Sequence, residues 1–202
     1  GLFEDNKIFS NTGAGVDIES NGAPTMRHNV VYNGKAAGFS IHDAGLGLLE
    51  NNDIYANELS GIEVSSYGNP TVRNNTIHEG VQAGVLVDRD GQGTFEGNDI
   101  HDNTKSGVEI KSGGNPIMSK NRIHDGKESG VLVYDDGLGL FESNEIYNDA
   151  IAGVEVRTFG NPTMRRNRIY DGKERGVLIH GTGQGQFEEN DIFGNARVGV
   201  EV

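Results

Sequence analysis

Four aspartates in two short segments are the first residues of this chain that could do chemistry. Asp88 and Asp90 lie on either side of an arginine, and Asp135 and Asp136 are adjacent to each other. Paired carboxylates cleave glycosidic bonds as acid and base, and clustered carboxylates bind Ca²⁺. These residues are therefore candidates for the catalytic pair of a carbohydrate-active enzyme, or alternatively for a calcium site. A solvated stack of alternating charges is the simpler interpretation, and we favour it.

A second set of candidates carries aromatic or imidazole rings at every twenty-third residue. Rings in line offer a platform for a sugar or a peptide, so the candidate binding residues are Tyr32, Tyr55, His78, His101, His124, Tyr147 and Tyr170, with Phe9 and Phe193 at the ends. The alternative, which we favour, is a structural ladder that every repeat requires. Three successive members are histidines, but ligands in a straight line about 4.8 Å apart do not converge on one ion. We therefore predict no metal site there.

A third set is acidic and occurs once every 46 residues: Asp17, Glu63, Glu109, Glu155 and Glu201. The alternate positions hold Ser40, Leu86, Leu132 and Leu178. Most of these residues lie between two apolar residues, so alternation along a strand places them on the outer face. Regularly spaced acids could bind a basic partner peptide, although keeping a β-surface soluble is the simpler role.

The spacing of all three sets follows from an internal repeat of 23 residues without insertion or deletion. One position is asparagine in every copy, from Asn6 to Asn190, with apolar residues three positions before it and two after it. Apolar segments of three to five residues between Gly, Asn and Asp are typical of short strands. One unit has only about four inward side chains, whereas stacked units bury a continuous core.

We therefore predict an all-β fold, a right-handed parallel β-helix (solenoid) of about nine 23-residue coils. The hexapeptide pattern of left-handed β-helices is absent. The invariant asparagine should face inward and hydrogen-bond to the next asparagine and to free backbone groups. The glycines from Gly22 to Gly183 are predicted at turns that need a positive φ. A column that alternates mainly Asn and Gly, from Asn11 to Asn195, is predicted to adopt the left-handed conformation.

Odd and even coils differ, so the complete unit is a 46-residue super-repeat. Even coils carry all four prolines where odd coils carry glycine. Two residues before the invariant asparagine, odd coils have Glu, and even coils have Arg, with Ser119 as the exception. Stacking makes opposite charges neighbours, whereas a slipped register would bring like charges together. We interpret this column as register control.

The segment GNPTMRRNRIYDGKERGVLIHGTGQGQFEENDIFGNARVGVEV, residues 160–202, resembles the β-helix repeats of CASH-type domains, named for carbohydrate-binding proteins and sugar hydrolases. The resemblance covers nearly the whole chain. It is strongest to the substrate-recognition region of large CASH-repeat F-box proteins, receptors of cullin-based ubiquitin ligases. Related repeats occur in bacterial and archaeal β-helix proteins, including polysaccharide-processing enzymes. The resemblance implies recognition of a protein or a glycan, but its matching residues are scaffold columns, which specify fold more than function.

Composition narrows the range of partners. A net charge of −13 disfavours nucleic acid and anionic membranes as partners. The absence of cysteine excludes disulfides and thiolate metal sites. The sequence shows neither a membrane-spanning apolar run nor a signal-peptide pattern, and it leaves the compartment unassigned.

We expect residues 1–202 to form a single solenoid domain within a longer chain. The leading hypothesis is a non-catalytic recognition or scaffold domain that needs no cofactor and presents variable turns to a protein or glycan partner. The first alternative is a polysaccharide hydrolase, lyase or epimerase, although coils without insertions lack long loops to build a cleft. The second alternative is a structural element that self-associates end to end.

Overall fold

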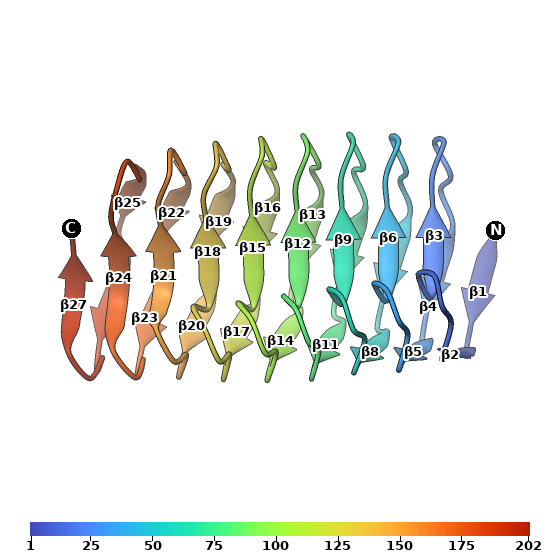
Figure 1. Cartoon of the computed structure of the whole chain (residues 1–202), viewed down its shortest axis with the longest axis horizontal. Helices are drawn as coiled ribbons and strands as arrows, with labels where there is room; N and C mark the ends of the chain where they lie inside the picture. The colour runs from blue at the N-terminus through green and yellow to red at the C-terminus, as the bar shows by residue number, and fades with distance from the viewer.

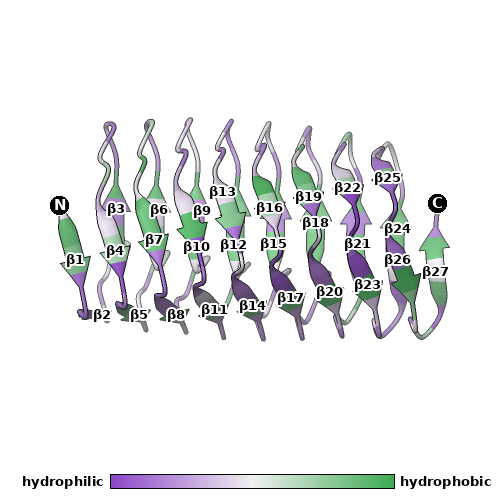
Figure 2. Cartoon of the chain, turned by 180° about the vertical axis from the view of Figure 1, so that it is seen from behind, coloured by the Kyte–Doolittle hydropathy of each residue, from purple (hydrophilic) through white to green (hydrophobic).

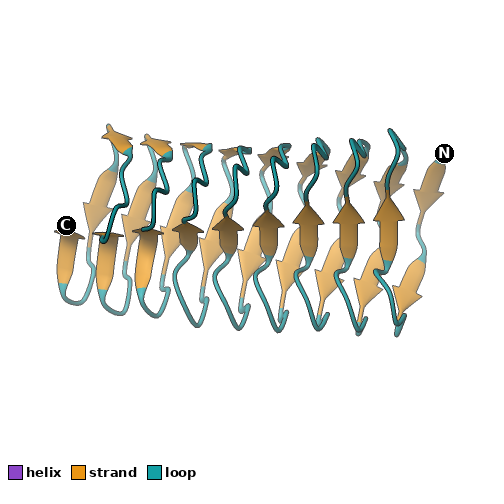
Figure 3. Cartoon of the chain, turned by 45° about the horizontal axis from the view of Figure 1, so that its top comes forward, coloured by secondary structure: helices purple, strands orange, loops and turns teal.

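The computed structural model describes residues 1–202 as a parallel β-helix of nine coils without any α-helix, which confirms the predicted fold class. Each coil contributes one strand to each of three nine-stranded parallel sheets, here called sheets A, B and C. The sheets run the length of the molecule, and the turns between them form rows along its edges (Figures 1 and 3). None of the elements is a helix of the length and hydropathy that a membrane crossing needs.

The strands of sheet A are β1 (Leu2–Glu4), β4 (Thr25–Arg27), β7 (Leu48–Glu50), β10 (Thr71–Arg73), β13 (Thr94–Glu96), β16 (Ile117–Ser119), β19 (Leu140–Glu142), β22 (Thr163–Arg165) and β25 (Gln186–Glu188). Those of sheet B are β2 (Lys7–Phe9), β5 (Val30–Tyr32), β8 (Asp53–Tyr55), β11 (Thr76–His78), β14 (Asp99–His101), β17 (Arg122–His124), β20 (Glu145–Tyr147), β23 (Arg168–Tyr170) and β26 (Asp191–Phe193). Those of sheet C are β3 (Val16–Ile18), β6 (Phe39–Ile41), β9 (Ile62–Val64), β12 (Val85–Val87), β15 (Val108–Ile110), β18 (Val131–Val133), β21 (Ala152–Val156), β24 (Arg175–Ile179) and β27 (Val198–Glu201).

The core is a continuous column of 28 buried apolar side chains. Strands of sheets A and B turn their middle residue inward, whereas strands of sheet C turn two residues inward and the residue between them outward. The fourth coil thus buries Val72, Ile77, Val85 and Val87, which matches the four inward side chains that the repeat predicts. Apolar strand segments alternate with polar turns along each coil (Figure 2).

The invariant asparagines form the predicted inward ladder. Asn75 illustrates one rung: its Nδ2 donates to Asn98 Oδ1 at 3.0 Å and to Leu49 O at 3.0 Å. Its Oδ1 accepts hydrogen bonds from both the backbone N and the Nδ2 of Asn52. Each rung therefore satisfies backbone groups that the turn leaves without strand partners.

The prediction for the column from Asn11 to Asn195 is wrong, because none of its residues has a positive φ. Its asparagines form a second amide ladder on alternate coils. Asn57 Oδ1 accepts from Gly34 N at 3.0 Å, and Asn57 Nδ2 donates to Val31 O at 3.3 Å. A Cβ on Gly34 would approach Asn57 Oδ1 to 3.0 Å, so the glycine makes room for the amide of the next coil.

The prediction for the glycine column from Gly22 to Gly183 is also wrong, because these glycines do not have a positive φ. Close packing excludes a side chain instead. A Cβ on Gly45 would lie 2.3 Å from Ile18 O in the preceding coil. The left-handed residues are the two before this column, such as Tyr67 (φ 64) and Asp90 (φ 61), so the turns from sheet C to sheet A carry bulky residues in that conformation.

Candidate functional site

A groove of about 400 Å³ lies on the outer face of sheet C, which faces the viewer in Figure 1. Its floor consists of the outward residues of β9, β12 and β15, namely Glu63, Leu86 and Glu109. Residues from the turns on both sides complete the lining: Leu59, Ser60, Gln82, Ala83, Lys105, Lys111 and Tyr134. The groove therefore combines carboxylates, cations, a phenol and one leucine in the middle of its floor.

Glu109 is the most constrained acid of the groove. The Tyr134 hydroxyl donates to Glu109 Oε1 at 2.5 Å, and Lys111 Nζ lies 3.6 Å from the same oxygen. Burial raises the pKa of Tyr134, and its hydrogen bond to Glu109 adds to the rise. The phenol is therefore neutral at neutral pH and acts as a hydrogen-bond donor. Both contacts fall on Oε1, which leaves Oε2 of Glu109 for a ligand.

Glu63, at the other end of the floor, has a raised pKa. Burial raises the pKa of Glu63, and the negative charge of Asp88 adds to this effect, while Arg89 and Lys111 oppose it. Arg89 Nη2 contacts Glu63 Oε1 at 3.2 Å. A carboxyl group with a raised pKa holds its proton to a higher pH than an exposed glutamate does.

The acids of sheet C point outward, as predicted from the alternation. They are sheltered rather than fully solvated: the side chains of Glu63, Glu109 and Glu155 are only 24%, 17% and 15% exposed. Turn residues supply a partner for each, as Arg157 and His180 do for Glu155. Such sheltered acids contribute less to solubility than the sequence interpretation assumed.

The structure does not gather the four aspartates that the sequence singled out. They lie in the turns from sheet C to sheet A, outside the groove, and Asp88 is only 8% exposed with its Oδ1 3.3 Å from Arg89 Nε. No three carboxylates of Asp88, Asp90, Asp135 and Asp136 lie within 4.8 Å of one another, because the sole group of this kind is elsewhere. Neither a ready-made calcium cage nor a shared cleft is formed by them.

That sole group is Glu19, His42 and Asp43, in the turns of the first two coils. His42 Nε2 lies 3.0 Å from Asp17 Oδ1, and Nδ1 lies 3.1 Å from Asp43 Oδ2. Burial lowers the pKa of His42, but hydrogen bonds and the charges of Asp43 and Asp17 outweigh it, so the pKa is raised. An imidazole whose two ring nitrogens each lie beside a carboxylate accounts for this geometry.

The rings of sheet B form the predicted structural ladder. From Phe9 to Phe193, successive ring centroids lie 4.5–5.1 Å apart with interplanar angles of 3–20°. Each inner ring has a neighbour on both faces, so Tyr32, Tyr55, His78, His101, His124, Tyr147 and Tyr170 offer only their edges to solvent. A flat sugar needs a free ring face to stack on, and the ladder has none between its ends.

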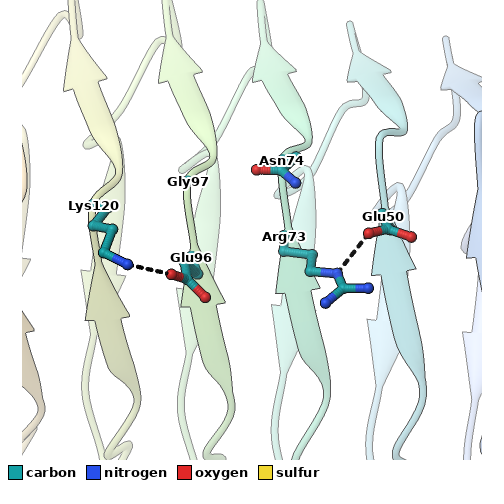
Figure 4. A pocket seen from close by; sticks show the side chains of 6 residues that line it. All are labelled: Glu50, Arg73, Asn74, Glu96, Gly97 and Lys120. Atoms are coloured by element: carbon teal, nitrogen blue, oxygen red, sulfur yellow. Dashed lines mark hydrogen bonds and ion pairs between the residues drawn. The ribbon is translucent and has the colours of Figure 1, made fainter.

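A second hollow, of about 430 Å³, lies on the outer face of sheet A and is shown in Figure 4. It contains two ion pairs, Arg73 Nε to Glu50 Oε1 at 2.6 Å and Lys120 Nζ to Glu96 Oε1 at 2.7 Å. Asn74 and Gly97 complete the lining, and a Cβ on Gly97 would meet Asn74 Oδ1 at 2.7 Å. The hollow has no apolar lining, and its charges are already paired with each other, so it is a weaker ligand site than the groove on sheet C.

These pairs belong to the column that we interpret as register control. Arg27 pairs with Glu4, Arg73 with Glu50, and Arg165 with Glu142. Each arginine thus contacts the glutamate of the preceding coil only. Glu96 lies opposite Ser119 in register and takes its partner, Lys120, from the next position. Glutamate and arginine therefore do alternate along sheet A, but each arginine pairs with only one of its two neighbouring glutamates.

Sequence reasoning missed Tyr134 as a site residue. The position after each sheet C strand varies from coil to coil, and Tyr134 is the only aromatic residue there, between Lys111 and Arg157 in the neighbouring coils. Both cations lie near its ring, at 5.8 Å and 4.9 Å from the centroid. The tyrosine between two cations at this position is the sequence feature from which Tyr134 could have been predicted as a site residue.

The chain matches the family model described as the right-handed β-helix region over residues 1–89 and 68–202. It therefore belongs to the right-handed β-helix family, which agrees with the handedness that the sequence predicts. The chain has no match among curated protein sequences.

Solved structures with a similar fold come from carbohydrate-active proteins. The A-module of Azotobacter vinelandii mannuronan C-5 epimerase AlgE6 is 22% identical with a TM-score of 0.70, over 95% of this chain and 63% of that one. The periplasmic alginate epimerase AlgG is 15% identical with a TM-score of 0.82, over 100% and 50% of the two chains. Pectate lyase Pel9A is 13% identical with a TM-score of 0.71, over 88% and 58%. This chain spans about half to two thirds of these structures, and the likeness shows a shared fold.

Proposed function

We propose that this chain is the glycan-binding part of a carbohydrate-active β-helix protein, and that an extended oligosaccharide lies along the groove of sheet C. The observation that carries the proposal is the groove itself, where Tyr134 and Lys111 hold one oxygen of Glu109 and leave the other for a ligand. Hydroxyl groups of a sugar can donate to such a carboxylate and accept from such a cation.

The shape of the groove supports an extended ligand. Its floor spans three successive coils, and no coil has an inserted loop that would close over it. A polymer can lie along a straight, open floor of this kind, whereas a small molecule would remain largely exposed. The similar solved structures include proteins named for mannuronan, alginate and pectate, all of which are polysaccharides.

The groove also contains groups suited to proton transfer on a sugar. The carboxyl group of Glu63, whose pKa is raised by burial, can exchange a proton with a sugar, and Glu109 with Tyr134 forms a second polar centre on the same floor. These groups support a polysaccharide hydrolase, lyase or epimerase activity more directly than Asp88, Asp90, Asp135 and Asp136, which lie outside the groove.

Binding can be tested by replacing Leu86, the apolar residue of the floor. We expect Leu86→Ser to weaken binding to immobilised polysaccharide oligomers by about tenfold, the ratio that roughly 1.4 kcal/mol of lost contact would give. The fold should tolerate the change, because Ser40 holds the equivalent position in β6. Leu178→Ser, in the same column but outside the groove, should leave binding unchanged. Equal binding by all three proteins on a glycan array would contradict the proposal.

Recognition of a protein partner, as in the CASH-repeat F-box proteins, is a second candidate. It is favoured by two aromatic side chains at the tips of the turns from sheet C to sheet A, Tyr67 and Phe159, which are 66% and 56% exposed. Exposed aromatic residues at loop tips are frequent anchors of protein interfaces. Tyr67→Ser with Phe159→Ser should abolish capture of such a partner and leave glycan binding intact.

A further inference from the structure

We propose that the ligand of the groove is an extended 1,4-linked glycan without carboxylate groups, a substrate class that differs from mannuronan, alginate and pectate. This inference rests on the proposed glycan-binding function. Two features of sheet C carry it: the two-coil period of its outward residues and the way its charges are paired.

The period comes from the alternation along the outer face. Glu63, Glu109 and Glu155 lie on β9, β15 and β21, with Leu86 and Leu132 on the strands between them. Strands about 4.8 Å apart give carboxylates roughly 9.6 Å apart along the axis. A 1,4-linked hexopyranose chain in its extended form advances by nearly one strand spacing per sugar, and successive sugars turn opposite edges to the same side. Every second sugar would therefore present the same edge to a glutamate, with a leucine below the sugar between.

The charges exclude a polymer with one carboxylate per sugar. The cations beside the floor are already paired with its acids: Arg89 lies 3.2 Å from Glu63, and Lys111 lies 3.6 Å from Glu109. Lys105 is the only cation of the lining without an ion-pair partner. A polyuronate would bring a row of negative charges against Glu63 and Glu109 on a chain of net charge −13, and such like-charge contacts are strongly unfavourable.

The partial burial of Glu63 and Glu109 strengthens the discrimination against uronates. The side chains of Glu63 and Glu109 are about one quarter and one sixth exposed, so salt screens their field less than that of free surface acids. Ionised carboxylates in such a setting form strong hydrogen bonds with hydroxyl or ammonium donors. The groove thus fits a glycan whose polar groups are donors, either neutral hydroxyls or amino groups.

The experiment is calorimetric titration of the whole chain with hexasaccharides that differ in charge or in linkage. The probes are 1,4-linked glucose, 1,4-linked glucosamine, mannuronate and galacturonate hexamers, with a 1,3-linked glucose hexamer as the geometric control. We expect the glucose or glucosamine 1,4-hexamer to bind at least about tenfold more tightly than either uronate, and the 1,3-linked hexamer to bind more weakly than its 1,4-linked isomer. Loss of binding in salt identifies the amino sugar, and binding that resists salt identifies the neutral one.

A variant without the two carboxylate charges of the floor tests the role of charge directly. Glu63→Gln with Glu109→Gln should narrow the gap between uronate and glucose hexamers by about tenfold, while Glu96→Gln on sheet A should not change it. Tighter binding of a uronate hexamer by the unaltered chain would overturn this inference and leave the proposed function standing. Absence of binding to every hexamer would overturn the proposed function itself.

Discussion

At the scale of single residues, Asp149 is the clearest exception to its column, because it is a buried acid with an unpaired oxygen. It occupies a position of the second amide ladder, where Asn57 and Asn103 stand in earlier coils, and it is fully buried. Its Oδ1 accepts from Gly126 N at 3.0 Å, but its Oδ2 has no hydrogen-bond partner. In the equivalent position, Asn57 Nδ2 donates to a backbone carbonyl. The carboxyl group can replace that donor only when it is protonated.

Burial raises the pKa of Asp149 well above its usual value, so this residue makes stability depend on pH. The folded state holds the proton more tightly than the unfolded state, in which the pKa of aspartate is about 3.9. The favourable contribution is therefore complete below pH 4 and is lost as pH rises through the raised pKa of the folded state. We expect Asp149→Asn to increase the free energy of unfolding at pH 7 by roughly 1–3 kcal/mol, which is the cost of an unsatisfied buried polar group.

Urea unfolding between pH 4 and pH 8 tests this prediction. The difference between the variant and the unaltered chain should grow as pH rises and then level off. Asp171→Asn, at an exposed position, is the control and should show no such trend. A variant that is less stable than the original chain at pH 7 would show that Asp149 is ionised and stabilised in a way that its contacts do not reveal.

At the scale of structural elements, the asparagine ladder is the device that connects one coil to the next. Asn98 accepts from the backbone N and Nδ2 of Asn75, and its Nδ2 donates to Val72 O and Asn121 Oδ1. Its removal leaves buried groups of two neighbouring coils without partners. We expect Asn98→Ala to lower the free energy of unfolding by about 3 kcal/mol.

The same substitution at the last rung is the matched control. Asn190 is only partly buried and has a ladder neighbour on one side, Asn167. Asn190→Ala should therefore cost clearly less in urea unfolding than Asn98→Ala. Equal losses would mean that the ladder is not a chain of cooperating rungs.

The elements also show what could be predicted from the sequence and what could not. Strand positions, the inward asparagine ladder and the ring ladder follow from a strict period, because every coil repeats the same local environment. The conformation at Gly45 and the role of Asn57 were predicted wrongly. In both positions the distance to an atom of a neighbouring coil decides the residue type, and a sequence column shows residue types without distances. The floor of the groove, Glu63, Leu86 and Glu109, belongs to an outward column that the sequence singled out. Its remaining lining, including Tyr134 and Lys105, was not predicted, because it comes from turn positions that vary from coil to coil.

At the scale of the whole molecule, acidic residues outnumber basic ones, 30 to 17. Most cations pair with acids across neighbouring coils, but the excess acids have no ion-pair partner, including Asp90, Asp135 and Asp136 in turns two coils apart. Their mutual repulsion opposes the compact state. We expect the melting temperature to rise by several degrees between about 10 mM and 150 mM NaCl, as the screening length falls from roughly 30 Å to 8 Å.

Thermal unfolding followed by circular dichroism tests this expectation, with a neutral osmolyte of equal osmolality as the control. A melting temperature that falls with salt would show that the paired charges on sheets A and C contribute more than the unpaired acids. That result would also indicate that ion pairs such as Glu50 with Arg73 contribute measurably to holding the coils in register.

The two-coil period limits how this chain can change in length. Removal of one even coil would place glutamate beside glutamate on sheet A and acid beside acid on sheet C, and it would also place asparagine where the second ladder needs a glycine. Removal of one odd coil would place proline beside proline, and in most cases leucine beside leucine on sheet C. Removal of two adjacent coils would restore every one of these neighbours. The molecule can therefore be shortened or extended without such mismatches only by even numbers of coils, and each such step would add or remove one acid and its alternate neighbour on the outer face of sheet C.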